Sequence, residues 1–391
     1  MKIAGIVAEY DPFHKGHAYQ IARVRELGAE KVVVCMSCDV VQRGGFAALP
    51  PAVRARAALL GGADLVVALP NPWACASAEN FAAAGVRLLA ALGCDTLAFG
   101  AETPDAESMM ALAKMLDSKE FSDALQKELA TGQDFATARA RAVNKSCPEV
   151  SCLLNLPNNI LGVEYCKAIQ RQKLKITPLP IQRKGAAHGQ EPQPGQGFAS
   201  ASAVRRLWQQ GELEKSLGYL PQSTHALYQE ALQGGQGIDP ARADAAVLSR
   251  LRAMSPEAFA RIRGVNEGLE NRLAGCVRTA VTLPELYDSL KTKRYAHSRL
   301  RRLVLDAALG YGDSLPALPP FALVLAARKT ALPLLKNAGV PAGTSLADLA
   351  RQNAECAAAA KAHAAATDLA ALCRRTPGPM GQAFTQKPIL L

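Results

Sequence analysis

Two histidines near the start of the chain, His14 and His17, have the spacing of a phosphate-binding motif. They stand in "EYDPFHKGH", between the apolar run "MKIAGIVA" and the helical pattern "HAYQIARVRELG". The start of a helix offers unpaired N–H groups and a partial positive charge, and Gly16 lets a phosphate approach because it has no β-carbon. Both imidazoles can donate hydrogen bonds to phosphoryl oxygens. The motif therefore predicts displacement at the α-phosphate of a nucleotide, with pyrophosphate as the leaving group.

The histidine pair also allows a metal site or a purely structural role. A metal site would need a third ligand, and none is evident nearby. A structural role would leave both histidines in the core or on the surface without a ligand. With six His and 30 Gly among 391 residues, chance predicts only about 0.007 occurrences of HxGH. The position between a strand and a helix therefore favours the phosphate interpretation.

A second candidate phosphate-binding element is "SASAVRRLW", which contains Ser200, Ser202 and Arg205. Serines at a helix N-cap leave backbone N–H groups available, and an arginine can bind two phosphate oxygens at once. Capped helices with an arginine are common, so this segment alone is a weak signal. The HxGH motif is what favours a phosphate-binding role for it.

The elements that must position these residues alternate along the first half of the chain. Strand patterns ("KIAGIVAEY", "KVVVCMS", "DLVVALP", "DTLAFG" and "LKITPLPIQR") are separated by helical ones. This alternation predicts an α/β fold with a parallel sheet and helices on both faces. Ligands bind at the carboxyl ends of such strands, where His14, residues 38–44, Pro70 and Gly100 fall.

The length of 391 residues suggests two domains. The stretch "AAHGQEPQPGQGFA" (186–199) is rich in Gly, Pro and Gln and predicts a loop. From about residue 211 onward the patterns are almost entirely helical. We therefore expect an ATP-binding catalytic domain over residues 1–210 and a helical domain over residues 211–391, with no internal repeat.

Composition narrows the class of protein. The net charge of +11 and pI of about 9.2 favour a polyanionic partner. Ten cysteines are scattered, and neither Cys35/Cys38 nor Cys147/Cys152 has a second pair at zinc-finger spacing, so we expect reduced, mostly buried thiols. No run of 18 apolar residues occurs, and the N-terminus makes a poor signal peptide. These features predict a cytoplasmic protein without a membrane partner.

The motifs also carry a resemblance to a known family. "EYDPFHKGH" followed by "ASASAVR" resembles the HxGH nucleotidyltransferases, and the match is closer to the bacterial tRNA(Met) cytidine acetate ligases. The hallmarks of that family recur in order: "VAEYDPFHKGH", "VVQRGGFA", "SAENFAAAG", "LAFGAE", "PNNILGVEY", "IQRKG", "SASAVRRL" and "TKRYAHSRLRR". They cover residues 3–302, with a fainter match near the C-terminus.

The resemblance implies an enzyme, an ATP-dependent ligase that forms a C–N bond. Acetate would be activated as acetyl-adenylate with release of pyrophosphate, and the acetyl group would pass to N4 of the wobble cytidine of elongator tRNA(Met), without acetyl-coenzyme A. The fold would be a Rossmann-like nucleotidyltransferase domain followed by a mostly α-helical domain. ATP is then a co-substrate, Mg²⁺ is expected without a readable ligand set, and no protein partner is predicted.

The resemblance also implies roles for individual residues. His14 and His17 would be catalytic. The residues that would line ATP are Val7, Ala8, Glu9, Tyr10, Asp11, Pro12, Phe13, His14, Lys15, Gly16, His17, Ala18, Tyr19, Gln20, Gly100, Asn158 and Arg183, joined by Ser200, Ser202 and Arg205 from the second element. The alternatives for the outlying positions are a strand-end turn at Gly100, a helix cap at Asn158 and a solvated basic pair at Arg183 and Lys184.

The chain departs from the family pattern at Asp11 and over residues 37–53. "SCDVV" stands where members usually have "SGNF", Asp11 replaces an Asn, and "GGFAALPPAV" lacks the usual lysine. Substrate contacts in this stretch are therefore expected to differ. Arg43 can meet a phosphate or acetate, or can belong to an ordinary loop.

A basic run near the middle of the second half, "KTKRYAHSRLRR" (291–302), is the candidate tRNA-binding surface. Its cations are Lys291, Lys293, Arg294, Arg299, Arg301 and Arg302. A helix here would place Arg294, His297 and Arg301 on one face, and Tyr295 would be able to stack on an unpaired base. The alternative is a solvated basic helix.

Two further functions are kept for comparison. One is an adenylyltransferase that acts on a small phosphorylated substrate and does not need RNA. The other is a nucleotide-sensing RNA-binding protein without turnover. The basic run disfavours the first, and the intact HxGH motif disfavours the second.

Overall fold

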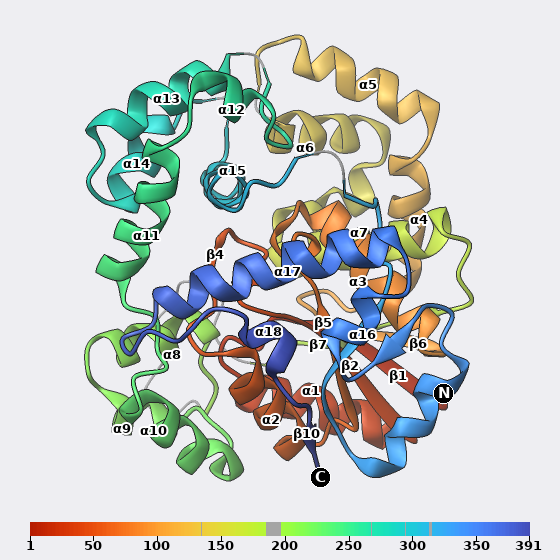
Figure 1. Cartoon of the computed structure of the whole chain (residues 1–391). Coiled ribbons are helices and arrows are strands. Elements are labelled where there is room, and N and C mark those ends of the chain that lie inside the picture. Colours follow the sequence, from red (N-terminus) through yellow and green to blue (C-terminus); the bar gives the residue numbers. More distant parts are fainter. Residues whose placement is uncertain (134, 185–196, 267, 294, 313–314) are drawn as a thin grey trace.

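A computed structural model describes residues 1–133, 135–184, 197–266, 268–293, 295–312 and 315–391 (Figure 1). Within these residues one sheet of eight strands forms the centre of the molecule, in the order β10-β8-β5-β2-β1-β6-β7 with β9 beside β8. The strands are β1 (Ile3–Ala8), β2 (Lys31–Ser37), β5 (Leu65–Leu69), β6 (Thr96–Ala101), β7 (Thr177–Gln182), β8 (Ala322–Ala327), β9 (Ala342–Gly343) and β10 (Ile389–Leu390). The first five are parallel, which confirms the predicted α/β fold.

Helices that connect the parallel strands pack on the sheet. These are α1 (Lys15–Glu26), α2 (Pro51–Leu60), α3 (Ala78–Ala91) and α7 (Pro157–Arg171). The packing of α3 on β1 depends on two glycines. A Cβ on Gly85 would lie 2.6 Å from Val7 Cγ2, and one on Gly5 would lie 2.8 Å from Leu89 Cδ1. Their lack of a side chain lets the helix approach β1 closely, which fixes the strand that leads into the HxGH motif.

Shorter elements complete the first half of the chain and the connection to the second. They are β3 (Val40–Val41), β4 (Gly45–Phe46), η1 (Trp73–Cys75), α4 (Ala106–Leu116), α5 (Lys119–Leu129), α6 (Phe135–Ser146), η2 (Pro148–Asn155), α8 (Ala201–Gln209), α9 (Leu213–Leu217), η3 (Gln222–Thr224) and α10 (His225–Gln233). The loop predicted over 186–199 lies largely outside the described residues.

A helical unit with its own apolar core follows. It contains α11 (Pro240–Arg252), α12 (Pro256–Ala260), α13 (Leu269–Thr279), α14 (Leu283–Leu290) and α15 (His297–Leu309), which lie together at the upper left of Figure 1. Leu273, Leu286 and Val304 are buried in this core, and Val40 and Cys75 from the first half join it. The helical unit is therefore docked on loops at the carboxyl ends of β2 and β5.

The chain then returns to the sheet. β8 pairs antiparallel with β5, and β10 pairs parallel with β8. Around them lie η4 (Lys329–Asn337), α16 (Leu346–Ala350), α17 (Ala354–Leu372) and α18 (Gln382–Thr385). The mostly helical C-terminal half is confirmed, but sequence analysis missed β8, and with it the return of residues 321–391 to the first core. The boundary near residue 210 stays a prediction.

All ten cysteines are free, and seven of them are buried, as predicted. Within the residues described, no helix is both long and apolar enough to span a membrane.

Candidate active site

The HxGH motif forms a closed hydrogen-bonded turn at the start of α1. His14 is the N-cap, and its Nδ1 accepts the N–H of Gly16 at 3.0 Å, while Nδ1 of His17 accepts the N–H of His14 at 3.3 Å. The two rings stack with centroids 3.7 Å apart. Because both Nδ1 atoms accept hydrogen bonds, each neutral ring carries its proton on Nε2. Each histidine can therefore donate a hydrogen bond from its Nε2–H.

The charge state of His17 follows from its surroundings. Burial lowers its pKa well below the ordinary value of 6.5, and electrostatic interactions with His14 and Arg183 act in the same direction. At neutral pH His17 is uncharged. Its Nε2–H can therefore donate a hydrogen bond to a phosphoryl oxygen while the ring keeps its proton.

A buried tyrosine fixes the turn from the outside. The hydroxyl of Tyr228 in α10 accepts the N–H of Phe13 at 3.0 Å and donates to the carbonyl of Phe13 at 3.1 Å. The Phe13 ring is fully buried and meets Tyr10 edge to face, with centroids 4.9 Å apart. Sequence analysis missed Tyr228, since it lies more than 200 residues away and belongs to no motif.

A cavity of about 510 Å³ opens at the carboxyl ends of β1, β6 and β7. Most of the residues predicted to contact ATP line it: Val7, Ala8, Glu9, Tyr10, Asp11, His14, Gly16, His17, Tyr19, Gln20, Gly100, Asn158, Arg183, Ser200, Ser202 and Arg205. Segments separated by almost 200 residues thus meet around one hollow.

Four of the predicted ATP-contacting residues do not line the cavity: Pro12, Phe13, Lys15 and Ala18. The Phe13 side chain is directed into the core, where a Cβ on Gly61 would lie 2.2 Å from its ring. Lys15 lies against the opposite side of the motif, and its Nζ donates to the carbonyl of Gly218 at 2.6 Å. Phe13 and Lys15 therefore support the turn, and the predicted contact of the four residues with ATP stays a prediction.

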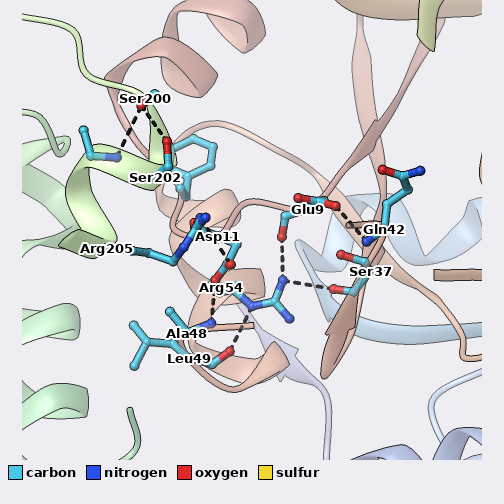
Figure 2. Close-up of polar contacts among 12 residues, drawn as sticks. Glu9, Asp11, Ser37, Gln42, Ala48, Leu49, Arg54, Ser200, Ser202 and Arg205 are labelled. Atoms are coloured by element: carbon cyan, nitrogen blue, oxygen red, sulfur yellow. Dashed lines mark hydrogen bonds and ion pairs between the residues drawn. The ribbon is translucent and has the colours of Figure 1, made fainter. Parts of the chain in front are cut away.

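The second candidate phosphate-binding element lies directly beside the first. Ser200 is the N-cap of α8, and its Oγ accepts the N–H of Ala203 at 3.3 Å and lies 3.0 Å from Oγ of Ser202. Arg205 donates to the carbonyl of Asp11 and lies 3.4 Å from the Asp11 carboxylate (Figure 2). This bond draws α8 onto the HxGH loop, so the N-termini of α1 and α8 both border the cavity.

The opposite wall of the cavity is built around Gly100, Asn158 and Arg183. A Cβ on Gly100 would lie 3.2 Å from Cγ of Arg183, so the glycine leaves room for the arginine side chain. Nδ2 of Asn158 donates to Oε1 of Glu102 at 2.5 Å, and Oε2 of Glu102 accepts the N–H of Asn159 at 3.0 Å. Leu156 is the N-cap of α7, which excludes the helix-cap alternative for Asn158.

A fully buried arginine joins the ends of β1 and β2. Arg54 donates to the carbonyls of Leu49 and Ser37 at 3.0 Å each, and also to that of Glu9 (Figure 2). It donates as well to the carbonyl of Cys38. The dipoles of these carbonyls compensate the charge of Arg54. The carbonyls lie at strand ends, where the hydrogen bonds between strands do not extend. In the pattern "AVRARAALL" nothing distinguishes Arg54 from the exposed Arg56, so the sequence analysis missed it.

The loop over residues 40–46 brings the helical unit to the cavity. Gln42 and Arg43 line the cavity, and so does Ser298 from the first turn of α15. Gly44 has φ of +80°, and a Cβ there would lie 2.5 Å from the backbone nitrogen of Arg302. Arg302 donates to the carbonyl of Gln42 at 3.3 Å. The predicted contribution of residues 38–44 to the rim is confirmed for Gln42 and Arg43, whereas the other residues of this stretch and Pro70 do not line the cavity.

The basic run 291–302 differs from its prediction. α15 begins only at His297, so the run is not one helix, although His297 and Arg301 do share a face. Tyr295 is only 7% exposed, and the Arg299 guanidinium lies 4.7 Å from its ring centre. The expectation that Tyr295 stacks on a base is therefore wrong. Lys291, Lys293 and Arg301 are exposed, whereas Arg299 and Arg302 are partly buried and Arg294 lies outside the described residues.

Comparisons with known proteins agree with this geometry. A family model described as HIGH Nucleotidyl Transferase matches residues 1–378. A curated protein named tRNA(Met) cytidine acetate ligase, from Acetivibrio thermocellus, is 32% identical over 419 residues and covers 100% of both chains. Crystal structures of Thermotoga maritima TmcAL also cover both chains fully. The apo form has a TM-score of 0.93 at 28% identity, and the form bound with alpha-thio ATP has 0.91 at 27%. The chain therefore belongs to the HIGH nucleotidyl transferases and, among them, to the tRNA(Met) cytidine acetate ligases.

Proposed function

We propose that the protein is an ATP-dependent ligase that activates acetate as acetyl-adenylate and transfers the acetyl group to N4 of the wobble cytidine of elongator tRNA(Met). The family gives the reaction, and the T. maritima relative binds an ATP analogue in the same fold. The observation that carries the proposal is the meeting of two helix N-termini, two Nε2–H donors and Arg205 around one cavity.

In the first half-reaction an acetate oxygen attacks the α-phosphorus of ATP, and the bond to pyrophosphate breaks. Acetate is already ionised at neutral pH, so no general base is needed. His14 and His17 donate to the phosphoryl oxygens on which negative charge grows. Arg205 and the N-terminus of α8 stabilise the departing pyrophosphate.

The nucleoside end of ATP is assigned to the wall that contains Gly100, Asn158 and Arg183. The rings of Phe99 and Tyr165 border the same part of the cavity and supply apolar surface for a base. The apolar surface of this wall also limits the access of water to acetyl-adenylate, which would otherwise hydrolyse.

Mg²⁺ is expected to enter with the phosphates of ATP, where it would neutralise charge. Among the residues that the structure describes, no three His, Cys, Asp or Glu side chains are grouped to hold a metal. Asp11 is already engaged by the N–H of Ala48 at 2.7 Å and by Arg205. These described residues thus offer no dedicated metal cage, and we assign no step to the ion.

The tRNA is assigned to the helical unit and its basic run. Lys291, Lys293 and Arg301 present exposed cations, and Ser298 from the same region borders the cavity. A phosphate backbone held by these cations would bring a splayed anticodon base to the cavity mouth. Arg299 and Arg302 mainly hold the helical unit together and to the catalytic loops. A cytoplasmic location and the lack of a protein partner stay predictions.

The test is pyrophosphate release from ATP by the purified protein, with and without acetate and tRNA(Met). Acetate-dependent release that is coupled to consumption of tRNA acceptor supports the proposal. Stable AMP transfer without tRNA would identify an adenylyltransferase. ATP binding without any release would identify a nucleotide sensor.

A further inference from the structure

Residues from both sides of the carboxyl end of β1 line the cavity, and we call these two sides the β6 arm and the β2 arm. β6 and β7 lie on one side of β1 and carry Gly100 and Arg183, while β2 lies on the other. The β2 arm is bordered by Glu9, Gln42 and Arg43, and by Ser298 of the helical unit. With the nucleotide in the β6 arm, the β2 arm is the side from which a tRNA base held by the helical unit can arrive.

Glu9 is the carboxylate of this β2 arm, and its backbone and side chain are both held in place. Its Oε1 accepts the N–H of Gln42 at 2.9 Å, and its carbonyl accepts a hydrogen bond from Arg54 (Figure 2). Oε2 accepts no hydrogen bond from any residue that the structure describes. One carboxylate oxygen is thus anchored, and the other remains available in a cavity that must admit an amino group.

The transfer step requires such a group. The lone pair of the cytosine N4 amine is delocalised into the ring, so N4 becomes an effective nucleophile only as it loses a proton. Nε2–H of His14 and of His17 are donors and are assigned to phosphate. Arg43, Arg183 and Arg205 are cations that cannot accept a proton. Asp11 is occupied by Ala48 and Arg205.

We propose that Glu9 is the general base of acetyl transfer. N4 attacks the carbonyl carbon of acetyl-adenylate and forms the C–N bond. The C–O bond to AMP breaks, and its electron pair leaves on the AMP phosphate. One N4 proton passes to Glu9, which later releases it to solvent. This assignment rests on the proposed function, and it moves Glu9 from the predicted ATP contacts to the acceptor side.

The electrostatic surroundings suit this role. Burial raises the pKa of Glu9 above its ordinary value and Asp11 raises it further, whereas the Gln42 hydrogen bond, Arg43 and Arg205 lower it. The other titratable neighbours, Cys75 and Tyr165, are uncharged at neutral pH because burial raises the pKa of each. A carboxylate with a raised pKa is a stronger base than an ordinary carboxylate. Transfer should therefore be lost as the pH falls through this raised pKa.

The experiment compares two acceptors for acetyl-adenylate formed by the same enzyme. Hydroxylamine is unprotonated at neutral pH and attacks acyl adenylates without help, whereas cytosine N4 needs the base. In Glu9→Gln, the ratio of tRNA acetylation to acetyl-hydroxamate formation should fall at least about 100-fold. Glu102→Gln is the matched control, because it makes the same change in the β6 arm and should leave the ratio close to that of wild type.

The outcomes separate the two proposals. In Glu9→Gln, an equal loss with both acceptors, or no loss with either, overturns the role of Glu9 but not the proposed function. A wild-type enzyme that forms neither product overturns the proposed function itself. If Glu9→Gln does not fold, Glu9→Asp decides. It keeps the carboxylate, so the pH below which tRNA acetylation fails should shift while hydroxamate formation keeps its pH profile. An unshifted profile overturns the proposal.

Discussion

The HxGH turn and the basic run of residues 291–302 differ in what fixes their structure. Local hydrogen bonds shape the first, and tertiary packing shapes the second. Residue type and spacing predict a function for both. The HxGH turn is stabilised by bonds within four residues, such as Nδ1 of His17 to the N–H of His14. In the basic run, packing decides: Tyr295 is buried under Arg299, and Arg302 is directed to the carbonyl of Gln42. A motif that makes its own hydrogen bonds can be interpreted from sequence, whereas a run of charges cannot.

The largest expected effect concerns the turn. His17→Ala removes one preorganised donor to the phosphoryl group, so acetate-dependent pyrophosphate release should fall about 100- to 1000-fold. The affinity for tRNA, measured by filter binding, should change less than about twofold, since the basic run is untouched. His225→Ala is the control, because the His225 ring bonds to the carbonyl of Leu220 and does not line the cavity. Full activity in His17→Ala would remove the basis for placing catalysis at this turn.

Arg54 tests how much tertiary hydrogen bonds stabilise the strand ends and loop beside the turn. Arg54→Met leaves four strand-end and loop carbonyls without their buried donor. The free energy of unfolding should therefore fall by about 3 kcal/mol. Arg56→Met on the same helix changes an exposed side chain and should cost less than about 0.5 kcal/mol. Urea unfolding of both variants measures the difference. Equal values would show that the bonds of Arg54 contribute nothing net.

Gly44 tests the contact between the two regions. Gly44→Ala places a methyl group 2.5 Å from the Arg302 nitrogen at a positive φ, so it should cost about 1–3 kcal/mol in thermal unfolding and weaken tRNA binding. Gly45→Ala is the neighbouring control, because nothing lies within 4 Å of a Cβ there. Similar stability and tRNA affinity of the two variants would mean that the helical unit does not depend on packing against this loop.

The smallest effect is expected within the basic run itself. Arg301→Glu reverses an exposed charge, so tRNA affinity should fall about tenfold, and the salt dependence of binding should lose about one unit of slope. Arg351→Glu, on the part of the chain that packs on the sheet, makes the same charge change elsewhere and should have less effect. An unchanged salt slope for Arg301→Glu would place the tRNA on another surface.

The fold could be predicted where the sequence period is clear. The five parallel strands and the helices between them are evident because strand and helix patterns alternate at short spacing. β8 escapes prediction, since "ALVLAA" is a short apolar run inside a helical region, and such a run does not distinguish a buried strand from a buried helix. β8 pairs with β5 from the far end of the chain, which no local pattern can indicate.

The site could be predicted only in part, and the reason is similar. His14, His17, Ser200 and Arg205 belong to motifs whose chemistry is evident from residue type. The remaining contributors meet distant backbone or reach the cavity from another element: Tyr228, Arg54, Glu102 and Ser298. Their roles depend on tertiary packing, so single-sequence patterns do not contain them.

The most direct test of the account follows isotopically labelled acetate into tRNA. The purified protein would be incubated with ATP, labelled acetate and tRNA(Met), and the digested tRNA analysed by mass spectrometry. We expect labelled N4-acetylcytidine at the wobble position, and none when ATP or acetate is omitted. An unlabelled wobble cytidine in a reaction that still releases pyrophosphate would contradict the account.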